Sequence, residues 1–222
     1  MNWQTEGILL SKTKFRENAN IINVFTNKYG KVSGIVYGGN SRKIRNYLQL
    51  SNKIFIFYTS KRENKLGYFK TELVEPIAPK YFNDKKKTSA LLSIVALLNS
   101  LLPEFQPYKN LYLSINNLIK NFNQDNWIIL YIIWEINLIK ELGFDPNLDK
   151  FDVDDNLSEI IEIDNIKYTV PKFLLAKRFD KIKDLSIKKA LIFTRSLIQN
   201  KFFLPNNLIF PRSRVHLENY LN

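Results

Sequence analysis

Five short stretches with the alternation of β-strands fill the first 76 residues, and they constrain the fold more than any other feature. They cover residues 7–10, 21–26, 30–37, 53–58 and 66–74. The stretches are rich in aromatic and β-branched residues, and glycines and polar residues separate them. The gap between the third and fourth stretches is longer than the others. Five such strands with one longer connection predict a small closed barrel of the OB type, with an SH3-like barrel as the alternative.

After Pro79 the apolar period changes from two to 3.6 residues. The new spacing predicts helices over residues 91–102, 111–122, 125–143 and about 185–198, followed by a short basic helix after Pro211. The third helix is apolar nearly all round, so we expect it at the centre of a helical domain. We expect Asp125 at its N-cap and Gly143 just past its end.

The sequence therefore predicts an α+β protein of two domains. Residues 1–78 form an OB-fold nucleic-acid-binding domain, and residues 79–222 form an all-α helical domain. An acidic, irregular insert at about 145–176 interrupts the helices, and residues 160–170 within it predict a small hairpin.

The chain is strongly basic, with 33 Lys and Arg against 21 Asp and Glu and a formal net charge of +12. Residues 1–76 hold 13 of these bases and only 5 of the acids. Such an excess predicts an anionic partner, which can be nucleic acid, anionic lipid or an acidic peptide. No secretory leader is evident, and the apolar run at 127–134 is too short to cross a bilayer, so we expect a cytoplasmic protein with no membrane role.

Enzyme chemistry has little support in the sequence. There are no cysteines, which excludes disulfides and thiolate metal sites, and His216 is the one histidine. No P-loop or dinucleotide fingerprint is present, and the acids of residues 145–164 lack the spacing of a calcium-binding loop. We expect no catalysis, cofactor or bound metal, and we expect His216 at the surface.

The basic residues of the barrel lie at predicted turns and strand ends, where one groove could collect them. Gly38, Gly39 and Asn40 end the third strand, and we expect the cations that follow to lie on a flexible loop. Tyr29, Tyr37 and Tyr58 are close in sequence and could either stack on bases or complete the barrel core. The predicted DNA-binding residues are Lys12, Lys14, Arg16, Lys28, Lys31, Tyr37, Arg42, Lys43 and Arg45. A further basic group is formed by Lys61, Arg62 and Lys65.

Several motifs resemble the bacterial recombination protein RecO family. They are residues 1–10, 24–30, 38–42, 48–49, 66–73, 101–104, 134–135, 141–144 and 211–214. The resemblance implies an OB-fold followed by a helical domain, binding of single- and double-stranded DNA, and annealing of complementary strands. It also implies partnership with RecR, binding of the C-terminal tail of single-stranded-DNA-binding protein, and loading of RecA, without a cofactor. Such a role implies a nucleoid-associated protein of the bacterial cytoplasm.

The sequence departs from this family at residues 151–156, where many members carry a four-cysteine zinc module. Without a thiol there, we expect no zinc at that place. Of the DNA contacts, Arg42 matches the family most directly, because it ends a Gly-Gly-x-Ser-Arg run.

Three functions remain open at this stage. The first is a non-catalytic recombination mediator, and the second is a scaffold that binds acidic peptide tails with only incidental nucleic-acid contact. The third, a metal-dependent nuclease, serves as a contrast. The cations expected to contact a partner protein are Lys188, Lys189, Arg195, Arg212 and Arg214.

Overall fold

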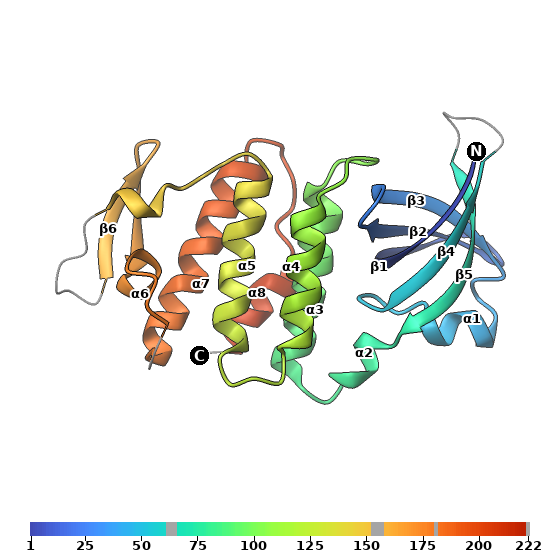
Figure 1. Cartoon of the computed structure of the whole chain (residues 1–222), viewed down its shortest axis with the longest axis horizontal. Helices are drawn as coiled ribbons and strands as arrows, with labels where there is room; N and C mark the ends of the chain where they lie inside the picture. The colour runs from blue at the N-terminus through green and yellow to red at the C-terminus, as the bar shows by residue number, and fades with distance from the viewer. Residues whose placement is uncertain (61–65, 152–157, 180–181, 221–222) are drawn as a thin grey trace. The chain divides into compact units, whose positions relative to one another are not determined.

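The computed structural model describes residues 1–60, 66–151, 158–179 and 182–220 (Figure 1). The chain forms two compact units, Met1–Leu113 and Ser114–Asn222. The predicted basic group at Lys61, Arg62 and Lys65 lies outside the described residues, as do residues 152–156 of the stretch at which we expect no zinc.

Five strands of the first unit close into a barrel. They are β1 (Asn2–Arg16), β2 (Ala19–Thr26), β3 (Gly30–Tyr37), β4 (Lys53–Thr59) and β5 (Gly67–Glu75). The strand order around the barrel is β1-β2-β3-β5-β4, and β3 and β5 pair in parallel while the other neighbours are antiparallel. This is a five-stranded barrel of the OB type, as predicted.

The barrel closes where β3 and β5 pass each other, and two glycines permit the approach. Gly34 pairs with Gly67 at this point. A Cβ on Gly34 would lie 2.5 Å from the ring of Phe69, and a Cβ on Gly67 would lie 2.3 Å from the ring of Tyr58. Both rings belong to the buried barrel core. The glycines therefore make room for the aromatic residues that fill the barrel.

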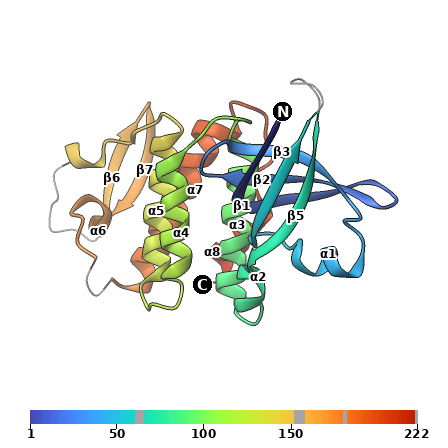
Figure 2. The ribbon, with the colours of Figure 1, turned by 45° about the vertical axis from the view of Figure 1, so that its right-hand side comes forward.

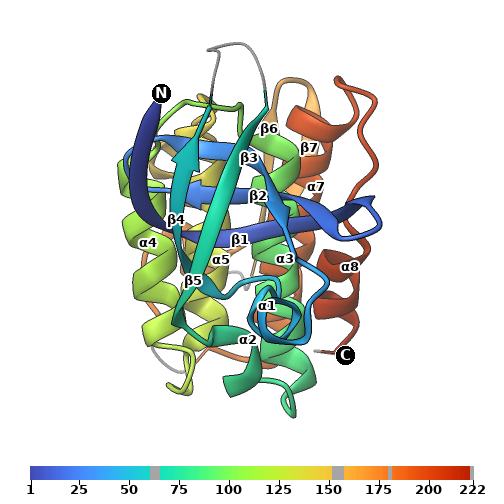
Figure 3. The ribbon, with the colours of Figure 1, turned by 90° about the vertical axis from the view of Figure 1, so that its right-hand side faces the viewer.

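The segment that follows β3 is a helix, so the prediction of a flexible loop was wrong. Helix α1 (Arg42–Tyr47) begins after Ser41, whose hydroxyl accepts a hydrogen bond from the Ile44 backbone N–H at 3.4 Å. The Tyr47 hydroxyl donates to the Thr71 carbonyl of β5 at 2.7 Å, and Ile44 packs against the barrel core. Figure 3 shows α1 beside the lower end of β5. These contacts order the connection between β3 and β4.

Helices α2 (Ile77–Lys80) and α3 (Lys85–Leu101) complete the first unit, and α4 (Lys109–Lys120) leads out of it. Helix α3 is joined to the barrel by polar bonds at its last turn. Asn23 of β2 donates to the side chain of Asn99 at 2.7 Å, and the Lys31 ammonium donates to the Asn99 carbonyl at 2.8 Å. In the structure the chain changes from strands to helices at Pro76, between β5 and α2, while the first compact unit continues to Leu113.

The second unit is helical with one small sheet (Figure 2). Its helices are α5 (Trp127–Glu141), η1 (Leu148–Lys150), α6 (Lys172–Leu175), α7 (Asp184–Ile198), η2 (Gln199–Phe203) and α8 (Arg212–Asn219). The predicted hairpin is confirmed as β6 (Ser158–Ile163) and β7 (Ile166–Pro171). Its two turn residues, Asp164 and Asn165, have φ of 48° and 62°, as a tight two-residue turn requires.

Helix α5 is the buried helix that its composition predicted. Tyr131, Ile132, Leu138 and Ile139 are fully enclosed, and α5 packs along α7. Its N-cap is Asn126, one residue later than the predicted Asp125. Gly143 follows the helix with φ of 92°, which agrees with the predicted C-terminal position.

Candidate nucleic-acid interface

Helix α1 presents three exposed cations at one end of the barrel. Arg42, Lys43 and Arg45 make no ion pair with any described residue. Lys12 of β1 joins them: its ammonium donates to the Leu48 carbonyl, the C-cap of α1, at 3.0 Å. Partial burial lowers the pKa of Lys12, and the positive charge of Arg45 lowers it further. The charges of Lys12 and Arg45 therefore repel each other, and both add to the positive potential beside α1.

The tip of the β1–β2 hairpin lies at the same end of the barrel. Asn20 donates to the Asn40 side chain at 3.1 Å, and Asn40 donates in turn to the Glu17 carbonyl at 2.8 Å. These bonds tie the hairpin to the turn that precedes α1. The exposed cations of the tip, Lys14 and Arg16, therefore extend the positive surface. We call this set the α1 cation surface: Lys12, Lys14, Arg16, Arg42, Lys43 and Arg45.

Lys28 and Lys31 lie at the other end of the barrel. They flank the β2–β3 turn, and the eight residues of β2 separate that turn from the hairpin tip, a span of roughly 23 Å. The Lys31 ammonium is bound to α3, and its burial lowers its pKa while Glu104 opposes the shift. We therefore leave Lys31 out of the α1 cation surface, because its ammonium already holds the barrel to α3 and lies at the other end of the barrel. Lys28 is exposed and lies 5.2 Å from the centre of the Tyr29 ring.

The three candidate tyrosines divide between core and surface. Tyr58 is buried, and Trp3 stacks between it and Tyr29 with ring centroids 4.5 Å and 4.1 Å apart. Tyr29 and Tyr58 therefore pack with the barrel core. Tyr37 is 54% exposed at the end of β3, near the start of α1. Of the three, Tyr37 alone offers most of its ring to a ligand.

An open groove of about 840 Å³ lies beside Tyr37 on the first unit. Tyr37 stacks on Tyr68 of β5, with centroids 5.5 Å apart, and both rings line this groove with Ile44 of α1. The sequence analysis did not name Tyr68 as a candidate beside Tyr37. The signal was present, because alternation along residues 66–69 directs Tyr68 outward when Phe69 points into the barrel.

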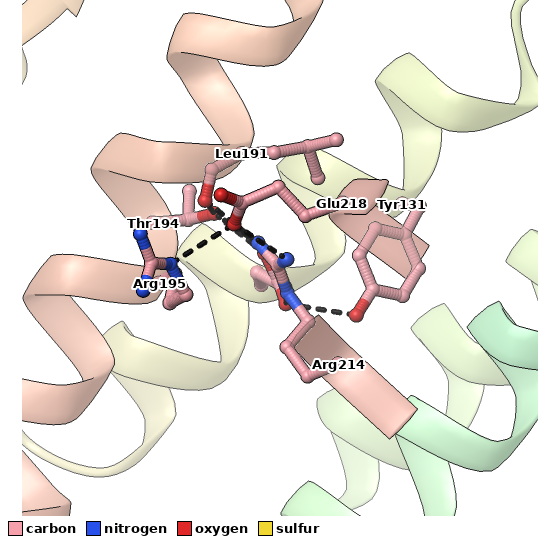
Figure 4. A network of polar contacts seen from close by, with 7 residues as sticks. Tyr131, Leu191, Thr194, Arg195, Arg214 and Glu218 are labelled. Atoms are coloured by element: carbon pink, nitrogen blue, oxygen red, sulfur yellow. Dashed lines mark hydrogen bonds and ion pairs between the residues drawn. The ribbon is translucent and has the colours of Figure 1, made fainter. Parts of the chain in front are cut away.

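Arg214 is not a surface residue, so its predicted contact with a partner protein was wrong. Its guanidinium is 0% exposed and forms a bidentate pair with Glu135, Nε to Oε1 at 2.5 Å and Nη2 to Oε2 at 3.0 Å. It also donates to the Leu191 carbonyl at 2.7 Å, and Figure 4 shows it beside Thr194 and Tyr131. Burial by itself would lower the pKa of Arg214, but the negative charges near it, that of Glu135 first, outweigh burial and raise that pKa.

The other predicted partner residues lie on α7 and α8. Arg195 is partly exposed and pairs with Glu218, Nε to Oε2 at 2.9 Å, while Arg212 is exposed. Lys188 and Lys189 are half-buried on α7. The exposure of His216 confirms its predicted surface position.

Lys189 borders a second groove, of about 460 Å³, between α7 and β7. Its walls include Ile166 and Ile192, which are 39% and 37% exposed, together with Lys167. An apolar floor with a cationic edge matches a peptide that carries both apolar and acidic side chains.

Neither metal ligands nor membrane spans are found in the part of the chain that the structure describes. No three His, Asp or Glu side chains there are grouped closely enough to hold a metal ion. None of the helices there has the length and apolar composition needed to cross a membrane.

Two family models match this chain in succession. The model described as "Recombination protein O N terminal" matches residues 1–77, and that described as "Recombination protein O C terminal" matches residues 83–151. The chain belongs to the RecO family. The first match covers the barrel and α1, and the second covers the chain from α3 to η1.

Individual relatives agree with this assignment. The DNA repair protein RecO of Roseobacter denitrificans is 34% identical over 145 residues, covering 65% of this chain and 60% of that protein. That of Hyphomonas neptunium is 34% identical over 153 residues, covering 68% and 63%. That of Ehrlichia chaffeensis is 28% identical over 224 residues, covering 100% of this chain and 86% of that protein. The match to the first two relatives thus spans about 60% of their length.

Proposed function

We propose that this chain is a non-catalytic DNA-binding recombination mediator. It binds single- and double-stranded DNA through the barrel, promotes annealing of complementary strands, and helps to load the RecA recombinase onto strands coated by single-stranded-DNA-binding protein. RecR and the C-terminal tail of single-stranded-DNA-binding protein are its proposed partners. Family membership supports this role.

The observation that carries the proposal is the α1 cation surface. Six exposed bases gather at one end of an OB-type barrel, and Arg42, Lys43 and Arg45 have no ion pair with any described acid. Unpaired cations on a rigid scaffold bind a polyanion by releasing its condensed counterions, which needs no particular base sequence. A protein that anneals strands of any sequence requires this kind of contact.

A strand-annealing assay tests the proposal. Two complementary oligonucleotides, one with a fluorophore and one with a quencher, are mixed with and without the protein. We expect the protein to speed annealing, and to retain this effect on strands coated with single-stranded-DNA-binding protein. Annealing at the uncatalysed rate under both conditions would refute the mediator role.

The groove beside Lys189 supports the second candidate, a scaffold for acidic tails. Its apolar walls and its two lysines, Lys167 and Lys189, suit an acidic peptide that ends in apolar residues. A double variant of this groove distinguishes peptide binding from DNA binding. Lys167→Ala with Ile192→Ser should weaken binding of such a peptide and leave binding of bare DNA unchanged. Loss of both activities in this variant would reject the assignment of this groove.

A further inference from the structure

Aromatic and apolar side chains from four elements line the groove next to α1. Val36 and Tyr37 come from β3, Ile44 from α1, and Phe57 and Tyr68 from β4 and β5. The bond from Tyr47 to Thr71 holds α1 against β5 and so fixes the distance between the walls. Its volume, about 840 Å³, lies within the usual range for small-ligand sites.

Two stacked rings at this groove remain open to solvent. Tyr37 is 54% exposed and Tyr68 is 40% exposed, and their rings lie 24° from parallel. A stacked pair of this kind has already lost most of its rotational freedom, so a third flat ring can add to it at small entropic cost. A nucleobase is such a ring, and base–aromatic stacking tolerates any base.

The charges around the groove indicate how a strand would lie. Arg42, Lys43 and Arg45 flank Ile44 on α1, which places phosphate-binding groups beside the groove. Lys70 and Glu72 of β5 both line the groove, so its interior carries one charge of each sign, whereas α1 carries three cations. The Glu72 carboxylate can accept a hydrogen bond from a base amino group. The backbone of a strand is therefore favoured along α1, with its base directed towards the tyrosines.

We propose that the Tyr37–Tyr68 pair holds one unpaired base of a bound strand while α1 holds its phosphates. This inference rests on the proposed DNA-binding function and deepens it. It makes the groove selective for single strands, because a base inside a duplex is already stacked and cannot enter.

Binding of fluorescent DNA by the whole chain tests the inference. The variant Tyr37→Leu/Tyr68→Leu removes both rings, and Tyr37→Phe/Tyr68→Phe is the matched control that keeps them. The probes are an oligothymidylate, an abasic strand of equal length, and a duplex. Circular dichroism and a thermal melt check that each variant is folded. We expect all of them to fold, because both tyrosines are exposed.

We expect the leucine variant to bind oligothymidylate about 5-fold to 150-fold more weakly than the wild type. Its affinity for the abasic strand and the duplex should be unchanged, and so should the slope of log affinity against log salt, because no charge is lost. The phenylalanine variant should behave like the wild type.

The alternatives give different results. Equal affinity of the leucine variant and the wild type for oligothymidylate overturns the inference and leaves the proposed function standing. An equal loss on all three probes also overturns it, since the rings then act on the backbone or on folding. If the wild type binds none of the probes, the proposed function fails as well. A shift in sedimentation of the leucine variant, with unchanged DNA affinity, assigns the groove to a second copy of the chain and rejects the inference.

Discussion

Separating the buried pair of Glu135 and Arg214 should destabilise the second unit strongly. Both side chains are 0% exposed. Removing Arg214 leaves Glu135 as an uncompensated buried charge, and removing Glu135 leaves the buried guanidinium with only the more distant Glu218 carboxylate, at 3.5 Å. We therefore expect Arg214→Met and Glu135→Met each to cost about 3–5 kcal/mol of unfolding free energy. Methionine is close to glutamate in length and fills most of the space of the arginine stem without its forked guanidinium, and its flexible side chain adapts to the gap that remains.

The double variant should be much less destabilised than the two single changes together. No unpaired charge remains in it, although the hydroxyls of Tyr131 and Thr194 each lose a hydrogen bond to Glu135 and the Leu191 carbonyl loses one from Arg214. We expect the loss of these bonds to cost about 2–4 kcal/mol, against about 6–10 kcal/mol for the sum of the single variants.

Urea unfolding measures these values, followed by tryptophan fluorescence in a Trp3→Phe background. The two remaining tryptophans, Trp127 and Trp134, both lie on α5 and so report on the second unit. A loss below about 1 kcal/mol in the single variants would refute the account of this pair. Strict additivity in the double variant would refute the claim that the two residues act as a unit.

Three further changes test the first unit and the insert. Gly30→Ala should cost about 1–3 kcal/mol in a thermal melt, because φ is 71° and the new Cβ would lie 2.0 Å from the Gln106 carbonyl oxygen. Lys31→Met should lower stability by about 1 kcal/mol but leave DNA affinity unchanged, since this ammonium is bound to α3. A hydrogen bond from the Asn147 backbone lowers the pKa of Asp145 in the folded protein. The ionised Asp145 therefore stabilises the fold at pH values above its unfolded pKa, and this stabilisation is lost as the pH falls through its folded pKa. Asp145→Asn should remove this pH dependence. Urea unfolding at a series of pH values would measure it, and we expect it to change the unfolding free energy by less than about 1 kcal/mol.

The barrel and the helices follow from the sequence because their signals are local. Alternation along residues 21–26 and 53–58 places Ile22, Val24, Ile54 and Ile56 on one face, and these four are buried in the barrel. The spacing of apolar residues marks α5 and α7 in the same way. Backbone geometry fixes the spacing of side chains on one face of a strand or helix. This spacing can therefore be recognised in the sequence even when the elements that pack against that face are unknown.

The environments of Lys31 and Arg214 depend on partners distant in the chain, which the sequence does not show. Lys31 looks like a surface cation until α3 places the Asn99 carbonyl beside it, 68 residues later. Arg214 likewise pairs with Glu135, 79 residues away, and nothing in the short motif around it shows this. A carboxylate within the apolar helix at 127–141 was the available signal, because a buried Glu requires a buried cation or donor.

Helix α1 was missed for a different reason. Two glycines and an asparagine precede it, and six residues are too few for a helix to be stable alone. The cap at Ser41 and the bond from Tyr47 to β5 stabilise it within the fold. The sequence shows the cations of α1, but their fixed placement on one rigid surface required the structure.

The central claim is that the α1 cation surface binds the phosphates of a strand. Its most direct test is fluorescence anisotropy of a labelled oligothymidylate over a series of salt concentrations. The test variant is Arg42→Ala/Lys43→Ala/Arg45→Ala, and its control is Lys109→Ala/Lys120→Ala/Lys150→Ala, which removes three exposed charges elsewhere. We predict that the α1 variant binds about 10-fold to 100-fold more weakly and that its log–log salt slope is smaller by about 2, since each phosphate contact contributes about 0.7. The control should stay close to the wild type. Equal losses in the two variants would contradict the account, because binding would then depend on net charge alone.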